Sequence, residues 1–238
     1  MERLDKILSA TGRWSRREAR ELVRQGRVSV DGHLAVTAEE KIDSAACILV
    51  DGEMLAHEKY IYVMLHKPAG VLSATEDSRQ PTVLDLLPPD WRRRGIAPVG
   101  RLDKDTEGLL LLTDDGALSH RLTSPRYHVD KVYYARVSGT LTMADAEAFA
   151  AGMILTDGLK CLPAELKILS PGECLVTLQE GKFHQVKRML AHRGKPVTYL
   201  KRLSMGDLRL DETLAPGAYR LLTPEELTLI SHSTPSKL

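Results

Sequence analysis

The sequence predicts an α+β fold with two domains, a small one over residues 1–58 and a larger one over residues 59–238. Helix-type spacing of apolar residues fills much of the first 30 positions, whereas short apolar runs typical of strands dominate from Tyr60 onward. These runs do not alternate regularly with long helices. The larger domain is therefore expected to hold a mixed, mainly antiparallel sheet flanked by helices.

Two short helices and a small sheet are expected in the first domain. Apolar spacing predicts a helix over residues 4–12. Ser15 and Glu18 then form a capping box, in which the serine hydroxyl accepts from a backbone N–H and the glutamate reaches back, so a second helix begins there. The remaining signals are a hairpin over residues 27–33, which turns at Asp31-Gly32, and a strand over residues 47–50.

The larger domain is expected to contain six main strands and five helices. The strands are predicted over residues 60–65, 108–113, 132–137, 165–168, 174–178 and 197–203. The helices are predicted over residues 82–87, 117–122, 144–151 and 185–192, and after a second capping box that starts at Thr223.

Positive charge is concentrated in the first 30 residues, although the formal net charge of the chain is only +1. This segment holds eight Arg and Lys against four acidic residues: Arg3, Lys6, Arg13, Arg16, Arg17, Arg20, Arg24 and Arg27. Most of them recur every three or four residues and form a stripe along the second helix. Such a stripe is either a solvated helix face or a surface that contacts phosphates.

Asp103 lies in a loop between two apolar runs, where a half-buried carboxylate needs a cation or hydrogen-bond donors. From the residues alone, Arg101 and Asp103 are either a structural ion pair or part of a site. Asp105 would share a face with Asp103 in an extended chain, but no third ligand with suitable spacing lies near. We therefore expect no metal site.

A second constellation lies in residues 181–205, which contain seven Lys and Arg and no acidic residue. This composition is typical of a surface that faces RNA. With the apolar residues of the predicted helix buried, Lys187 falls at the border of the buried face and Arg188 points to solvent. Lys187 is thus the candidate partner of a buried carboxylate, and Arg188 is the candidate partner of a phosphate. His184 fits a hydrogen-bonding role better than a metal-binding role.

Tyr133 and its neighbour Tyr134 complete the set of candidates. Adjacent strand residues face opposite sides of a sheet, so one ring belongs to the core and the other faces away from it. An aromatic ring that faces a basic cleft can stack on an extruded base.

Two resemblances connect these features. Residues 1–50 resemble the S4 RNA-binding domain, in Arg3-Leu-Asp-Lys6, Ser15-Arg16 with Glu18-Ala19, Gly26-Arg27-Val28 and Val30-Asp31-Gly32. The remaining chain resembles the pseudouridine synthases of the branch that carries an S4 domain and acts on ribosomal RNA. The matching motifs, in the family's order, are His66-Lys-Pro-Ala-Gly70, Gly100-Arg-Leu-Asp-Lys-Asp-Thr-Glu-Gly-Leu109, Lys131-Val-Tyr133 and Glu180-Gly-Lys-Phe-His-Gln-Val-Lys-Arg-Met189.

The resemblance implies a role for each of four residues. Asp103 matches the catalytic aspartate, which attacks the target uridine at the uracil ring or at the ribose anomeric carbon. Tyr133 matches the tyrosine that stacks on uracil and helps move protons, and Arg101 matches the arginine that enters the RNA as the base leaves. Lys187 matches the cation paired with the aspartate. Many relatives have Arg there, so this pair is expected to be monodentate. Contacts to RNA are expected from Arg3, Lys6, Arg16, Arg17, Arg20, Arg27, Lys67, His184 and Arg188.

The implied function is the isomerisation of a specific uridine in 16S ribosomal RNA, without a cofactor or metal. Alternatives are the same reaction on 23S ribosomal RNA and a catalytically silent RNA-binding protein of ribosome assembly. The expected partner is ribosomal RNA or a small-subunit assembly intermediate, and the expected state is a monomer in the cytoplasm. The chain has no Walker or Rossmann glycine motif, no signal segment and no apolar run long enough for a membrane.

Overall fold

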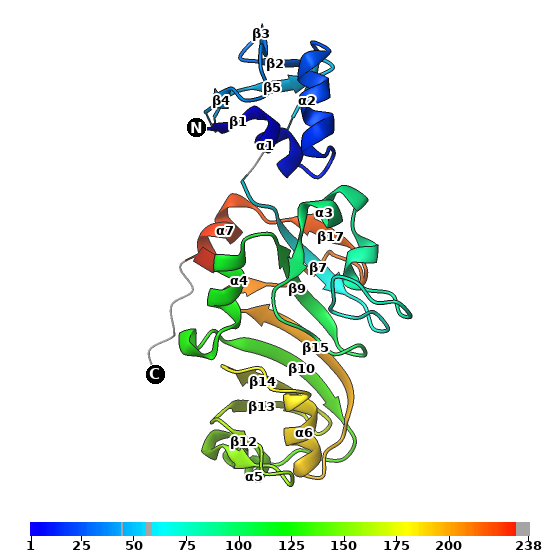
Figure 1. Ribbon diagram of the computed structural model, residues 1–238. Coiled ribbons are helices and arrows are strands. Elements are labelled where there is room, and N and C mark those ends of the chain that lie inside the picture. The colour runs from blue at the N-terminus through cyan, green and yellow to red at the C-terminus, as the bar shows by residue number, and fades with distance from the viewer. Residues whose placement is uncertain (44, 56–58, 232–238) are drawn as a thin grey trace. The chain divides into compact units, whose positions relative to one another are not determined.

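The structure is a computed structural model that describes residues 1–43, 45–55 and 59–231 (Figure 1). It divides into two compact units, and each is described by itself. The first comprises Met1–Ile61 with Leu87–Ile96, and the second comprises Tyr62–Leu86 with Ala97–Leu238. The domain boundary expected at Glu58 falls outside the described residues. The grouping of residues 87–96 with the first unit was not expected from the sequence.

The first unit packs two helices against a small sheet, as the sequence predicts. Helices α1 (Leu4–Ala10) and α2 (Arg16–Arg24) bury their apolar residues in a core with the sheet. The predicted capping box opens α2, because Ser15 Oγ accepts from the Glu18 N–H at 3.3 Å and the Ser15 N–H donates to Glu18 Oε2 at 2.6 Å.

The described residues of this unit also form six short strands. A four-stranded sheet has the order β3-β2-β5-β6, and a separate antiparallel pair joins β1 to β4. Their bounds are β1 (Glu2–Arg3), β2 (Val28–Val30), β3 (His33–Leu34), β4 (Lys41–Ile42), β5 (Ile48–Val50) and β6 (Glu53–Met54). Helix α3 (Pro89–Arg94), which the sequence did not predict, also belongs to this unit.

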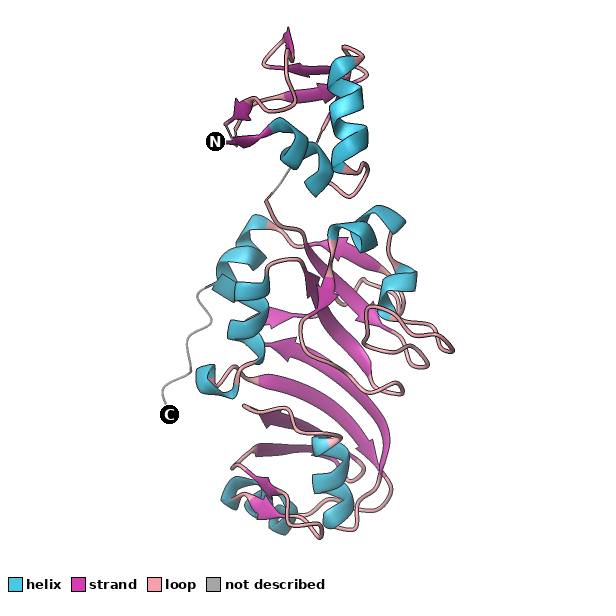
Figure 2. Ribbon diagram, in the orientation of Figure 1, coloured by secondary structure: helices cyan, strands magenta, loops and turns pink. Residues whose placement is uncertain are grey.

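The second unit is built on one large sheet, drawn as a curved layer of strands in Figure 2. Its order is β13-β14-β10-β15-β9-β7-β17, with β16 added to β15 and β8 added to β9. All pairs are antiparallel except β15 with β9. The strands are β7 (Tyr62–Lys67), β8 (Ala97–Pro98), β9 (Glu107–Thr113), β10 (Lys131–Val137), β13 (Glu165–Ser170), β14 (Glu173–Leu178), β15 (Val197–Met205), β16 (Leu208–Arg209) and β17 (Tyr219–Leu221). The predicted α+β class and mainly antiparallel mixed sheet are confirmed.

The predicted helices of this unit are present with one correction, and a 3₁₀ turn and a small strand pair that were not predicted accompany them. They are α4 (Gly116–Thr123), the 3₁₀ turn η2 (Pro125–Tyr127), α5 (Met143–Ala151), the small pair β11 (Met153–Ile154) and β12 (Lys160–Cys161), α6 (Gln185–His192) and α7 (Pro224–Ser231). Helices α4 and α7 pack on β7 and β9 in one apolar core (Figure 1). The helix expected over residues 82–87 is instead a 3₁₀ turn, η1 (Val83–Leu86), which Asp85 caps through the Thr82 N–H at 2.7 Å.

One close backbone approach fixes the middle of this sheet. Gly108 in β9 pairs with Arg202 in β15 at the parallel junction, and its φ of +105° lies in a region that favours glycine. A Cβ atom at this position would lie 2.2 Å from the Arg202 carbonyl oxygen. Position 108 therefore admits no side chain without separating the two strands.

Replacing Gly108 tests this constraint. We expect Gly108→Ala to lower the free energy of unfolding by about 3 kcal/mol, through backbone strain and loss of strand contact. The matched control is Gly116→Ala at the start of α4, where an added Cβ meets no atom within 4 Å and the expected change is within about 1 kcal/mol. Urea unfolding followed by far-UV circular dichroism measures both, and equal stabilities of the two variants would contradict the assignment.

Candidate active site

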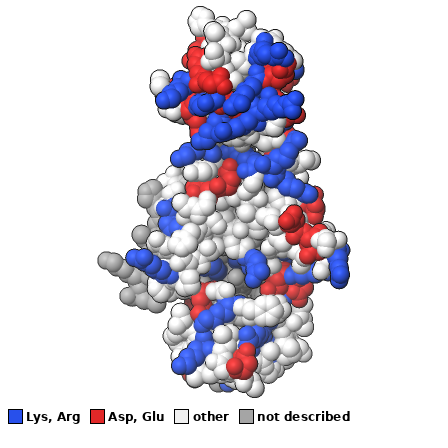
Figure 3. All heavy atoms as spheres, viewed as in Figure 1, with Lys and Arg blue, Asp and Glu red and all other residues white. Residues whose placement is uncertain are grey.

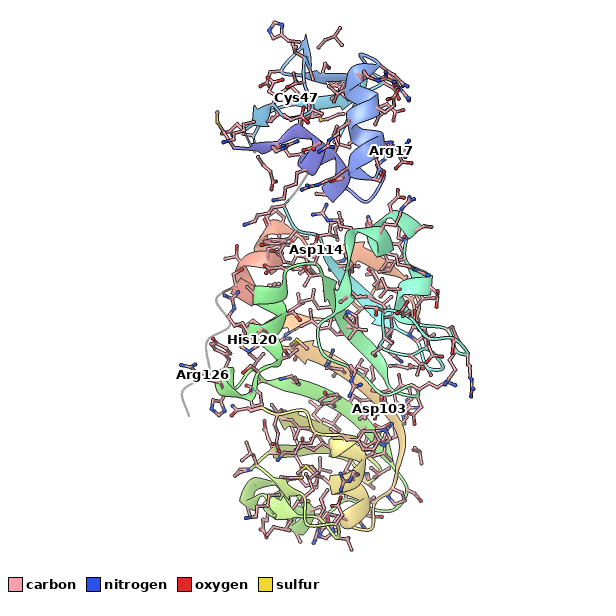
Figure 4. All side chains as sticks on the ribbon, viewed as in Figure 1. Arg17, Cys47, Asp103, Asp114, His120 and Arg126 are labelled. Atoms are coloured by element: carbon pink, nitrogen blue, oxygen red, sulfur yellow. The ribbon has the colours of Figure 1, made fainter. Side chains whose placement is uncertain are left out.

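An ion pair joins two segments that are far apart in the sequence. Asp103 lies in the loop between β8 and β9 (Figure 4), and Lys187 lies in the first turn of α6. Lys187 Nζ is 2.9 Å from Asp103 Oδ2 and 2.5 Å from Asp105 Oδ1. The Asp103 and Lys187 side chains are 23% and 20% exposed, so both are largely withdrawn from water, whereas Asp105 is 76% exposed.

The charge of Lys187 is secured by these carboxylates. Burial by itself lowers the pKa of the Lys187 ammonium, but the hydrogen bonds and charges of Asp103 and Asp105 outweigh that effect and raise the pKa above its usual value. The hydrogen bond from Lys187 in turn lowers the pKa of the Asp105 carboxyl. The ammonium is therefore retained at and well above neutral pH.

The loop that carries Asp103 is fastened on both sides of that residue. Before it, Ser73 Oγ donates to the Leu102 carbonyl at 2.9 Å and accepts from the Leu102 N–H at 3.1 Å. After it, the Lys67 ammonium donates to the carbonyls of Lys104 at 3.2 Å and Thr106 at 2.9 Å. These contacts fix the backbone of the loop on both sides of Asp103, so its carboxylate is held in a defined position.

This position of Lys67 corrects the RNA contact expected for it. The side chain is fully buried, and a third bond runs to the Pro68 carbonyl at 2.9 Å. Burial lowers the pKa of the Lys67 ammonium to about 8. The sequence shows a lysine in a strand-to-loop junction but cannot show that its end turns inward to satisfy carbonyl groups.

A pocket opens beside Asp103 and is lined by residues from four parts of the second unit. Its lining includes Arg101, Asp103, Tyr133, His184 and Leu200. Tyr133 of β10 is 8% exposed and faces this pocket, while Tyr134 on the other face of the strand donates its hydroxyl to Glu173 at 2.7 Å. Arg101 is exposed, and within the described residues it forms no ion pair.

The turn before α6 brings His184 to the pocket. His184 has φ +51°, a left-handed conformation that is uncommon outside glycine, and its Nε2 lies 3.5 Å from Asp103 Oδ1. Buried Glu180 stabilises the turn, because its carboxylate accepts from Gln185 Nε2 at 2.5 Å and from the Leu162 N–H at 2.9 Å.

Arg188 differs from the solvent-facing arginine that was expected. It forms an ion pair with Asp157, and its Nη1 donates to the Phe183 carbonyl at 3.5 Å. Lys187 lies at the border of the buried helix face, as the helical spacing predicts. The sequence does not show that Asp157, 31 positions before Arg188, lies beside it.

The expected basic face of the first unit is only partly free. Lys and Arg gather on the drawn face of this unit (Figure 3), but Arg3 and Arg20 bind the fully buried Asp5 at 3.0 and 3.1 Å and lower the pKa of its carboxyl. Arg27 pairs with Asp51, and Lys6 pairs with Glu2.

Two other arginines of α2 remain available. Arg16 and Arg17 are exposed, and within the described residues neither forms an ion pair (Figure 4 labels Arg17). These two side chains are therefore the part of the predicted stripe that is best placed to meet phosphates.

The chemistry of the site follows from its groups. A carboxylate beside an ammonium can attack an electrophilic carbon, and an aromatic ring with an exposed guanidinium near it can hold a planar ring. Across the described part of the chain, no group of three His, Cys, Asp or Glu side chains is arranged to hold a metal. Among the same residues, no helix combines the length and apolarity needed to cross a membrane.

Comparisons with known proteins identify what the chain is similar to. Residues 61–192 match the profile of a family described as RNA pseudouridylate synthase, and residues 2–43 match that of the S4 domain. An uncharacterised RNA pseudouridine synthase of Bacillus subtilis is 47% identical over 234 residues, which cover 96% of this chain and 98% of that protein.

Two further relatives extend the comparison. The ribosomal small subunit pseudouridine synthase A of Escherichia coli strain K12 is 40% identical over 232 residues, which cover 96% of this chain and 99% of that protein. A solved structure described as a pseudouridylate synthase has a TM-score of 0.68 at 36% identity and covers 97% of this chain and 100% of its own.

Removing the buried ammonium tests how the Asp103 loop is held. We expect Lys67→Met to lower the free energy of unfolding by about 2–4 kcal/mol, because buried carbonyls lose their donor. The control is Lys104→Met, an exposed lysine in the same loop, with an expected change within about 0.5 kcal/mol.

The effect of Lys67 depends on pH in a defined direction. The unfolded chain keeps this proton up to about its usual pKa of 10.5, and the folded protein keeps it only to about 8. Between these values the unfolded state binds more protons, so the stability contributed by Lys67 increases with pH. Urea unfolding at pH 7 to 10 should show the gap between wild type and Lys67→Met widening, and a gap that narrows would contradict the assignment.

Proposed function

Because the chain belongs to the RNA pseudouridylate synthase family, we propose that it converts one specific uridine of 16S ribosomal RNA to pseudouridine. The observation that carries this proposal is the ion pair between Asp103 and Lys187 in a pocket that also presents Tyr133 and Arg101. The choice of 16S ribosomal RNA is supported by nearly full-length similarity to the small-subunit synthases.

Asp103 is the nucleophile. Its carboxylate forms a bond to uracil or to the ribose C1′, the C1′–N1 bond breaks, and the uracil turns in the pocket. A C1′–C5 bond then forms, and the bond to Asp103 breaks, which regenerates the carboxylate. The proton leaves C5 and N1 gains one, so the reaction is an isomerisation that consumes no other reactant. The work of the protein is to extrude, position and activate the nucleotide.

Lys187 places a positive charge beside the nucleophile in a site that is largely withdrawn from water. Its Nζ lies 2.9 Å from Asp103 Oδ2, where an opposite charge interacts strongly with a partly buried carboxylate. Since the ammonium is a single point donor shared with Asp105, it holds Asp103 without the two-pronged geometry of an arginine.

Tyr133 and Arg101 hold the target base outside the RNA stack. Tyr133 lines the pocket, so its ring can stack on uracil while its hydroxyl exchanges protons with the turning base. Arg101 is exposed and unpaired among the described residues, so it is free to occupy the gap that the extruded uridine leaves. His184 contacts the RNA beside Asp103.

The first unit supplies sequence-independent affinity for RNA. Arg16 and Arg17 contact phosphates directly, while Arg3 and Arg20 chiefly orient the surface through Asp5. We propose that the protein acts as a cytoplasmic monomer on ribosomal RNA or on an assembling small subunit, and that it needs no cofactor or metal.

Mapping pseudouridine in ribosomal RNA tests the substrate and the nucleophile together. In cells that lack this protein, one pseudouridine in 16S ribosomal RNA should disappear. The wild-type gene and an Asp207→Asn control, whose aspartate is exposed in the turn between β15 and β16, should restore it. Asp103→Asn should fold, bind RNA and restore nothing, a loss of at least about 10⁴-fold.

The other outcomes separate the alternatives. Loss of a modification in 23S ribosomal RNA would show that the substrate is 23S and not 16S ribosomal RNA. An unchanged set of modifications would indicate a catalytically silent RNA-binding protein. Restoration by Asp103→Asn would remove Asp103 from its assigned role.

A further inference from the structure

An exposed aromatic side chain lies next to the pocket and has no part in the reaction described above. Phe183 is 72% exposed, whereas Phe149, the only other phenylalanine in the sequence, is fully buried. Its ring is stacked on the His184 imidazole, with the centroids 3.8 Å apart and the planes 18° from parallel. One face of the ring is therefore covered, and the rest is left in water.

Phe183 and His184 line two different depressions of the surface. His184 lines the pocket that holds Asp103, and Phe183 lines a separate groove of about 490 Å³. The groove is also bordered by Leu155, Thr156 and Asp157 after β11 and by Arg188 and His192 of α6. A volume of about 300–1,000 Å³ is usual for sites that take small molecules or parts of larger ones.

We propose that this groove binds the base of an unpaired nucleotide that adjoins the target uridine, stacked on Phe183. This inference rests on the proposed function and adds a second subsite to it. Bases stack on exposed aromatic rings whatever their identity, so Phe183 offers a platform that tolerates many sequences. The His184 ring behind it continues the stack toward Asp103.

The polar groups of the groove suit a base rather than a bare phosphate. Arg188 presents donors, but it is already paired with the carboxylate of Asp157, which repels a free anion. Both side chains line the groove together with Phe183, so an acceptor and donors are available to the edge of a base.

The geometry of the platform is fixed before RNA arrives. His184 adopts a left-handed backbone conformation at the start of α6, and the Phe183 carbonyl accepts from Arg188 Nη1. A ring that is already oriented loses little conformational freedom on binding, which favours stacking over contacts that must be ordered first.

Fluorescence of a base analogue tests the subsite without any turnover. The probe is a single-stranded RNA nonamer with one central uridine and 2-aminopurine directly on its 5′ or its 3′ side, titrated at 50 mM salt. We expect wild-type protein to quench one of the two probes through stacking. Phe183→Leu keeps an apolar side chain without a ring and should abolish the quenching and weaken binding about 5- to 30-fold.

Two controls separate stacking from general surface effects. Phe183→Trp restores an aromatic face and should bind within about threefold of wild type. Met143→Ala removes a similarly exposed apolar side chain, 69% exposed at the start of α5, and should change nothing.

The outcomes decide the subsite separately from the reaction. Quenching that Phe183→Leu abolishes supports the subsite even if the mapping of ribosomal RNA shows no loss of pseudouridine. Unquenched probes, a failure of the nonamers to bind, or equal affinities of wild type and Phe183→Leu would overturn it, even where pseudouridine formation is established.

Discussion

The contact between Asp103 and Lys187 is the interaction on which the rest of the site depends. The Asp103 carboxylate is only 23% exposed, and the Lys187 ammonium at 2.9 Å supplies an opposite charge beside it. Asp105 shares the same ammonium from the exposed side, so one lysine serves two acids. The Lys187 ammonium therefore lies at the border between the pocket and water, and the two carboxylates account for its raised pKa.

The large sheet brings Asp103 and Lys187 together. The Asp103 loop precedes β9 and α6 precedes β15, and the two strands run side by side in the one parallel pair of that sheet. Gly108 permits the approach of the strands, while Lys67 and Ser73 fasten the loop on either side of the nucleophile. Stability and function thus use the same contacts, because a shift of the loop would separate the carboxylate from its cation.

Local signals in the sequence were sufficient for much of this arrangement. Capping boxes, helical spacing and apolar runs predicted α2, α6 and the main strands, and the spacing of α6 placed Lys187 at the border of its buried face. What could not be predicted depends on contacts between residues apart in the sequence: the inward turn of Lys67, the pairing of Arg188 with Asp157, and the pairing of Arg20 with the buried Asp5. Each is a charged side chain whose partner is remote or whose burial depends on the whole fold. The exposure of Phe183 could not be predicted either, since phenylalanine side chains are usually buried.

Single-turnover rates of Lys187 variants test the central claim most directly. Lys187→Arg keeps a cation beside Asp103 and should react within about tenfold of wild type, whereas Lys187→Gln keeps a polar side chain of similar reach without charge and should be slower by about 10²–10³-fold. Both should bind the substrate RNA nearly as wild type does. If Lys187→Gln formed pseudouridine at the wild-type rate, the charge of Lys187 would be dispensable and this account of the site would be contradicted.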